Sequence, residues 1–132
     1  MTEGRQRSSF GGKSFLVTRE HWIRCGCALA AFVMAVSLFA GAQTVAIVPL
    51  FPPPFDKLAH FIYYATMAAL LAHAVGARWL IVPLVLVPLV GAADEWHQLT
   101  IAGREASIWD WVADGAGGVF AVVLYRTWRK KR

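Results

Sequence analysis

The sequence predicts an all-α protein, namely an integral membrane bundle of four transmembrane helices with both termini cytoplasmic. Of its 132 residues, 58% are hydrophobic and only 16% are charged, and the mean hydropathy is +0.51. Soluble domains carry about a quarter charged residues, so this deficit of charge indicates a protein that resides in a bilayer. The apolar residues also gather into four long runs, and a chain of this length forms one compact domain.

Each apolar run is bounded by residues that start or stop a helix. The first run carries no charge, and the prolines at 52–54 block a helix after it. Asp56 can cap the second helix by accepting hydrogen bonds from the free amides of its first turn. A glycine and an alanine at 76–77 make a tight turn before the third run, which tolerates Pro83 and Pro88 because neighbouring helices satisfy the backbone. The predicted spans cover about residues 25–43, 57–75, 79–98 and 108–128.

The two ends of the chain differ in composition from the runs between them. Residues 1–20 combine glycine, serine and scattered charge, which predicts a disordered basic cytoplasmic tail. Residues 129–132 form a second, shorter basic tail, so that 21–128 constitute the transmembrane domain. The small residues at 40–42 also fit a signal-peptide cleavage site. The apolar run continues past them, which favours an uncleaved first span.

Positive charge orients the predicted bundle. Of the 13 Lys and Arg side chains, all but Lys57 and Arg104 fall before the first span, between the second and third spans, or around the end of the fourth. Because loops rich in Lys and Arg stay in the cytoplasm, both termini are predicted inside and the loops at about 44–55 and 99–107 outside. The net charge of +5 therefore reflects topology, and no nucleic-acid partner is expected.

Polar side chains recur where the last three spans meet the predicted outer side. Within a span they are three or four residues apart, as are Lys57 and His60 or Asp110 and Asp114, so they share one helix face. Polar groups at membrane depth are costly and usually mark a functional site. The residues expected to form this site are Asp56, Lys57, His60, Tyr64, Glu95, Gln98, Arg104, Asp110 and Asp114.

A patch of small residues on the fourth span provides a way for these helices to meet. The patch consists of Ala113, Ala116, Gly117 and Gly118. Small residues allow helix backbones to approach closely in lipid. The fourth span is therefore expected to bring its two aspartates toward the polar residues of the second and third spans.

The polar residues allow more than one chemistry. His60 with Glu95 or Asp114 can form a general acid–base pair, because imidazole titrates near neutrality and a carboxylate orients it. Arg104 can hold a phosphate or a carboxylate through its planar guanidinium group. An ion pair of Glu95 with Lys57 or Arg104 would instead be purely structural, because it offsets the cost of the carboxylate without any reaction.

No metal and no other cofactor is predicted. The side chains of His60, Glu95 and Asp114 can in principle bind a metal, and so can His97. However, no HExxH-like spacing is present, and Glu95 and His97 are too close in sequence to point along one helix face. The sequence also lacks a P-loop, a glycine-rich nucleotide loop and a serine nucleophile elbow.

Four motifs follow one another in a fixed order. They are DKLAHF at 56–61 with Tyr64, DEWHQ at 94–98, Arg104, and DWVADGAG at 110–117. These motifs resemble the VanZ-like family, whose pattern is DK..HF..Y, then E..Q, then an arginine, then D...N..G. Order and spacing are kept over about residues 56–118. Asp114 departs from the pattern, because the family more often has asparagine there.

The resemblance implies a small multi-pass protein of the bacterial inner, or cytoplasmic, membrane that acts in the cell envelope. The family's namesake is associated with low-level resistance to teicoplanin, a glycopeptide that acts on the cell wall outside the membrane. An outward polar site fits such an envelope role. Resistance itself is not implied for this chain.

Three functions are therefore open. In the leading hypothesis, an outward polar pocket binds an anionic membrane lipid or a lipid-linked wall precursor, whose anionic group meets Lys57 and Arg104. In the second, the protein is a membrane-embedded hydrolase or transferase with His60 and Glu95 as its acid–base pair. In the third, the polar groups only lock the helices together, at about 0.6 kcal/mol each, in a structural module or one that binds a membrane protein partner.

Overall fold

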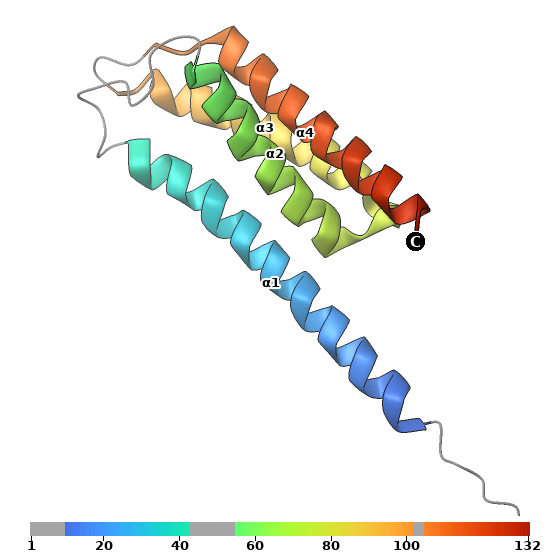
Figure 1. The fold of residues 1–132 in the computed structure, drawn as a ribbon. Helices are drawn as coiled ribbons and strands as arrows, with labels where there is room; N and C mark the ends of the chain where they lie inside the picture. The colour runs from blue at the N-terminus through green and yellow to red at the C-terminus, as the bar shows by residue number, and fades with distance from the viewer. Residues whose placement is uncertain (1–9, 43–54, 102–104) are drawn as a thin grey trace, which may run out of the picture.

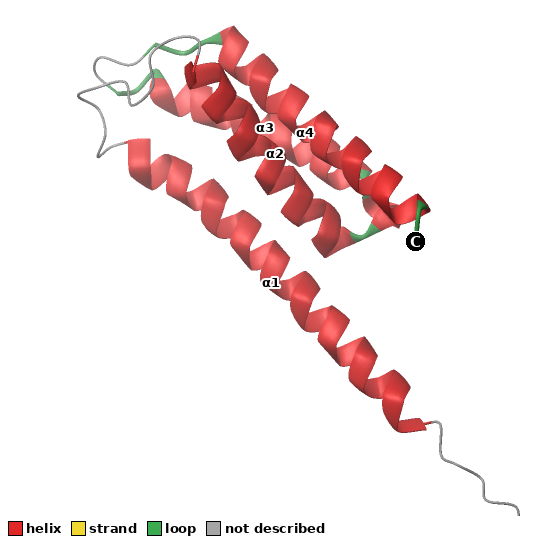
Figure 2. Cartoon of the chain, viewed as in Figure 1, coloured by secondary structure: helices red, strands yellow, loops and turns green. Residues whose placement is uncertain are grey.

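The computed structural model describes residues 10–42, 55–101 and 105–132, and within these ranges all regular structure is helical (Figures 1 and 2). No strand occurs among the described residues. In chain order the elements are α1 (Phe10–Ala42), α2 (Phe55–Val75), the short 3-10 helix η1 (Ala77–Trp79), α3 (Ile81–Gln98) and α4 (Ile108–Lys130). The prediction of an all-α protein is therefore confirmed.

Three of these helices are long and apolar enough to cross a membrane. The qualifying segments are Arg19–Ala40 within α1, Phe55–Val75 and Ile108–Lys130. Helix α3 is not among them, because the polar side chains of Asp94 and Glu95 and their neighbours fill its last turns. Its 18 residues span about 27 Å at the α-helical rise, slightly less than the roughly 30 Å hydrocarbon core. The prediction of four membrane spans is thus confirmed for three helices.

The observed helix ends differ from the predicted spans mainly at the N-terminus. Helix α1 begins at Phe10, so residues 10–20, predicted as part of a disordered tail, belong to it. No proline interrupts this segment, so the helix continues through its polar residues. Residues 1–9 lie outside the described part of the chain. The predicted turn contains Gly76 at a φ of 77°, and η1 follows it, so that α3 begins at Ile81.

Successive helices run antiparallel, so that their termini gather at two opposite ends of the bundle. Helices α2, α3 and α4 pack together, and α1 lies along α2 with its N-terminal part extending beyond the bundle (Figure 1). At one end, Arg24 of α1 donates hydrogen bonds to the carbonyl oxygens of Ala74 (2.9 Å) and Val75 (2.8 Å). These carbonyls are free because α2 ends there, and the C-terminus of α4 lies at the same end.

The opposite end of the bundle, called here the polar end, is where α2 begins, α3 finishes and α4 begins (Figure 1). The antiparallel arrangement of the structure agrees with the topology inferred from positive charge. The side of the membrane that each end faces stays a prediction from the distribution of Lys and Arg.

Small residues bring α4 against both of its neighbours. A Cβ on Gly117 would meet the carbonyl oxygen of Phe61 and the amide nitrogen of Ala65, both in the α2 backbone. Gly118 packs against the side chain of Val87 in α3. The small residues of α4 therefore let it approach α2 and α3 closely, as the sequence predicts. Only a glycine at 117 allows the backbones of α2 and α4 to come this near.

The core between the helices is small and consists largely of residues from α2. Tyr64, Met67 and Ala68 are buried, together with Val87 of α3 and Ala31 of α1. By contrast, many large apolar side chains on the outside are more than half exposed. Such an apolar surface is unsuitable for water and is what membrane lipid would cover.

Candidate functional site

The predicted polar residues come together at the polar end. All of them except Arg104 lie within the described residues, and Asp94 joins them. Arg104 falls in 102–104, outside the described part of the chain. This group, called here the polar cluster, consists of Asp56, Lys57, His60, Tyr64, Asp94, Glu95, Gln98, Asp110 and Asp114.

Lys57 connects the beginnings of α2 and α4. Its ammonium nitrogen lies 2.7 Å from Asp56 Oδ2 and 2.6 Å from Asp110 Oδ1. Asp56 also accepts a hydrogen bond from the Lys57 amide (2.8 Å), which is one of the free amides of the first turn, although α2 begins at Phe55, one residue before the predicted cap. Two carboxylates thus already balance the one lysine of the cluster.

His60 and Asp114 form the deepest polar contact between α2 and α4. The Nδ1 atom of His60 lies 2.9 Å from Oδ1 of Asp114, whose side chain is fully buried. Helix α3 leaves room for this carboxylate with Gly91, because a Cβ there would meet the Asp114 side chain. The His60 ring stacks over Tyr64, with the ring centroids 6.2 Å apart. The imidazole is therefore fixed in orientation, with its Nε2 atom left for another partner.

Glu95 ties the end of α3 to the start of α4. Glu95 is only 8% exposed. Its Oε2 atom accepts a hydrogen bond from the Ser107 amide at 2.6 Å. The other oxygen, Oε1, is buried and has no hydrogen-bond partner among the described residues. Asp114 Oδ2 and the Tyr64 hydroxyl are in the same situation. Unpartnered buried polar atoms are uncommon in folded proteins, and each one calls for a partner such as an ordered water, an ion or a ligand.

Asp94 and His97, both in the last turns of α3, lie in different surroundings. Asp94 is 4% exposed and accepts a hydrogen bond from Gln98 Nε2 (3.1 Å), so it belongs to the buried site. Its four-residue spacing from Gln98 was the available signal. His97, considered as a metal ligand in the sequence, instead lies against Phe39 of α1, with the ring centroids 5.4 Å apart.

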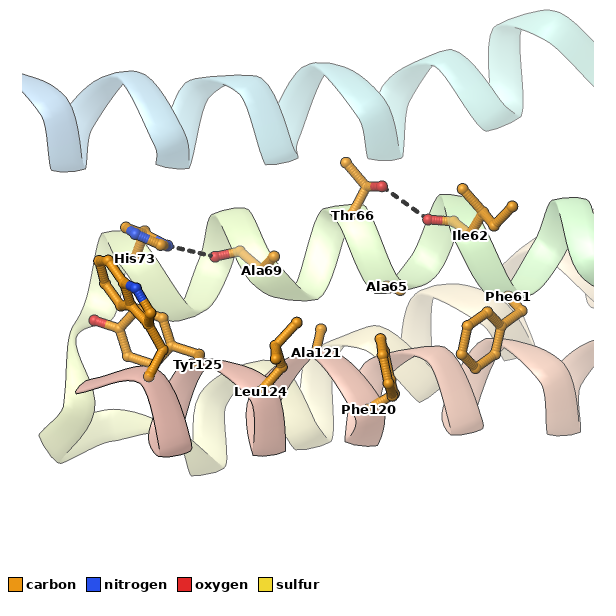
Figure 3. A pocket seen from close by; sticks show the side chains of 11 residues that line it. Phe61, Ile62, Ala65, Thr66, Ala69, His73, Phe120, Ala121, Leu124 and Tyr125 are labelled. Carbon is orange, nitrogen blue, oxygen red and sulfur yellow. Dashed lines mark hydrogen bonds between the residues drawn. The ribbon is translucent and has the colours of Figure 1, made fainter. Parts of the chain in front are cut away.

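An apolar groove runs along α2 and α4 from the polar end toward the other end of the bundle. It has a volume of about 680 Å³ and extends from Phe61, next to His60 in the chain, to Trp128. Figure 3 shows its lining side chains, which come from α2 and α4. Its Thr66 hydroxyl donates to the Ile62 carbonyl (2.8 Å), and His73 Nδ1 lies 3.2 Å from the Ala69 carbonyl. The polar atoms of these two side chains are thus engaged with the α2 backbone.

Helices long and apolar enough to span a membrane, with a cluster of ionisable groups buried between them at one end, define the class, an integral membrane protein. The sequence profile of the VanZ/LLP1 family matches residues 12–129. The chain belongs to this family, which confirms the resemblance drawn from its four motifs. No curated protein and no solved structure matches the chain.

Proposed function

We propose that the protein binds an anionic cell-envelope lipid, or a lipid-linked wall precursor, at the predicted outer side of a bacterial cytoplasmic membrane. The headgroup would occupy the polar cluster, and the hydrocarbon chain would lie in the groove between α2 and α4. The observation that carries this proposal is that the cluster and the groove share the same two helices and follow each other along them.

The two parts of the site suit the two parts of such a lipid. The groove is lined almost entirely by hydrocarbon and aromatic side chains, which favours an alkyl or prenyl chain. Lys57 is the cation of the cluster within the described residues, and Arg104 follows α3 by a few residues. Because Asp56 and Asp110 already contact Lys57, Arg104 is the main group for a phosphate, which its planar guanidinium group can hold through a bidentate contact.

Filling the groove should displace the lipid chain. Leu124 and Val123 are neighbours on α4 with similar exposure, 57% and 55%, but only Leu124 lines the groove. We expect Leu124→Trp to reduce a specifically retained lipid several-fold, whereas Val123→Trp leaves it at the wild-type level. Mass spectrometry of co-purifying lipids measures the difference, with unfolding temperature as the control for folding.

The same measurement on Arg104→Ala and Glu95→Gln tests the headgroup site. If wild type enriches one lipid species and these variants lose it while remaining folded, the polar cluster binds its headgroup. If all proteins carry the same bulk lipid and the variants melt earlier, the cluster is an interhelical lock, and a membrane protein partner becomes the better candidate.

One observation favours a second function, a membrane-embedded hydrolase or transferase. The 2.9 Å contact of His60 with Asp114 is the arrangement in which a carboxylate orients an imidazole for general acid–base work. Asp114 would thus orient His60, and Glu95 would lie across the site from both. This function requires that His60→Gln abolish turnover of a lipid-linked substrate in a protein that still folds.

A further inference from the structure

Three side chains from three different helices offer donor atoms to one point in the polar cluster. A ring nitrogen of His60 (α2), a carboxylate oxygen of Glu95 (α3) and a carboxylate oxygen of Asp110 (α4) all lie within 4.8 Å of one another. We propose that these three residues bind one divalent transition-metal ion. The metal site does not depend on the proposed lipid ligand and can exist without it.

Each of the three residues has one polar atom fixed by the protein and a second atom left for the metal. Asp114 holds Nδ1 of His60, the Ser107 amide holds Oε2 of Glu95, and Lys57 holds Oδ1 of Asp110. The remaining atoms are Nε2, Oε1 and Oδ2. Outer partners of this kind orient metal ligands, and a carboxylate on the far nitrogen of a ligating histidine is their usual form.

The unpartnered oxygen of Glu95 points independently to a ligand. The side chain is more than nine-tenths buried, and its Oε1 atom has no hydrogen-bond partner in the described residues. A carboxylate oxygen buried in this way is costly unless a donor or a cation meets it. A metal ion at the common point would supply that partner.

The balance of charge in the cluster also favours a cation. Its described members include the carboxylates of Asp56, Asp94, Glu95, Asp110 and Asp114 but only one lysine. Lys57 contacts two of these five groups. Repulsion among the rest is reduced by a bound dication, which is often the largest local charge in a site.

The donor set indicates the class of metal. One imidazole and two carboxylates suit Zn²⁺ or Mn²⁺ better than Mg²⁺ or Ca²⁺, which prefer oxygen ligands alone. Ligand atoms around a tetrahedral ion lie about 3.4 Å apart, so these side chains would close by roughly 1 Å on binding. Three protein ligands leave a coordination position for water or for a phosphate oxygen.

Metal binding by the purified protein tests the proposal. The full chain is purified in detergent through a tag without histidine, stripped with a chelator, and titrated with Zn²⁺ or Mn²⁺. We expect one bound ion per chain, measured by elemental analysis after desalting. Glu95→Gln, Asp110→Asn and His60→Gln should each weaken the affinity at least tenfold.

Two matched variants serve as controls. Glu20→Gln removes an exposed carboxylate of α1 outside the polar cluster, and His97→Asn removes an imidazole that lies against α1. Both should bind the ion within about twofold of wild type. The metal should also raise the unfolding temperature of wild type but not of Glu95→Gln.

A wild-type protein that binds neither ion would overturn the metal site, as would an equal loss of binding in Glu20→Gln and Glu95→Gln. Retention of a specific lipid by the metal-stripped protein would leave the proposed function standing, so the two ideas fail separately. If a ligand variant does not fold, the remaining two variants decide the outcome.

Discussion

Replacing Gly117 with alanine is expected to destabilise the bundle, whereas replacing Gly115 with alanine is not. A Cβ at 117 would meet the backbone of α2 at Phe61 and Ala65, and a backbone cannot rotate away as a side chain can. Overpacking of this kind costs about 1–3 kcal/mol. A Cβ at 115 meets nothing within 4 Å, so Gly115→Ala should gain up to about 1 kcal/mol from its better helix propensity.

Unfolding of the two variants in detergent, followed by circular dichroism, measures this opposite pair of effects. Both substitutions are identical in chemistry and lie two residues apart on α4, so a general effect of alanine on the helix cancels. Equal stability of Gly117→Ala and Gly115→Ala would mean that α2 and α4 are not in backbone contact, and the close approach in the structure would be wrong.

The sequence predicts the helices and their order because each apolar run has clear limits. Proline, glycine and charged residues mark those limits, and Gly76 lies in the predicted turn. The start of α1 was harder to predict, because no proline stops the helix between Phe10 and the apolar run. Composition distinguishes membrane-spanning residues from polar ones, but it does not distinguish a polar tail from a polar extension of the same helix.

Most of the polar cluster could be predicted for the same kind of reason. Spacings of three and four residues show which side chains share a face within one helix, and the small residues of α4 indicate which helices come close. These rules do not give the rotation of one helix about its axis relative to another. That rotation buries Asp94, and it places Asp110 rather than His97 close to His60 and Glu95. Both findings therefore come only from the structure.

Replacing Asp114 with alanine should be among the most damaging single changes in the chain. The side chain is fully buried between His60 and Gly91. Its removal leaves His60 Nδ1 without its acceptor and opens a cavity. Losing the partner of a buried polar group and creating a small cavity together cost about 2–4 kcal/mol.

Asp114→Asn should behave quite differently, because it keeps an oxygen for the contact with His60 and removes a charge from a fully buried position. We expect its stability to lie within about 1 kcal/mol of wild type, in line with the asparagine that the VanZ-like pattern more often has there. Thermal unfolding of both variants in the same detergent measures the contrast. Equal losses in the two variants would show that the charge of Asp114, rather than its hydrogen bond, holds α2 and α4 together.

The asparagine variant also separates folding from function. A neutral amide at 114 still orients the His60 ring. Compared with a carboxylate, however, it makes the Nε2 atom of His60 a weaker metal ligand. Changes to such outer partners lower metal affinity by about 10–100-fold. We therefore expect Asp114→Asn to fold like wild type and to bind Zn²⁺ at least tenfold more weakly. An unchanged affinity would mean that Asp114 stabilises the helix pair without acting on the proposed metal.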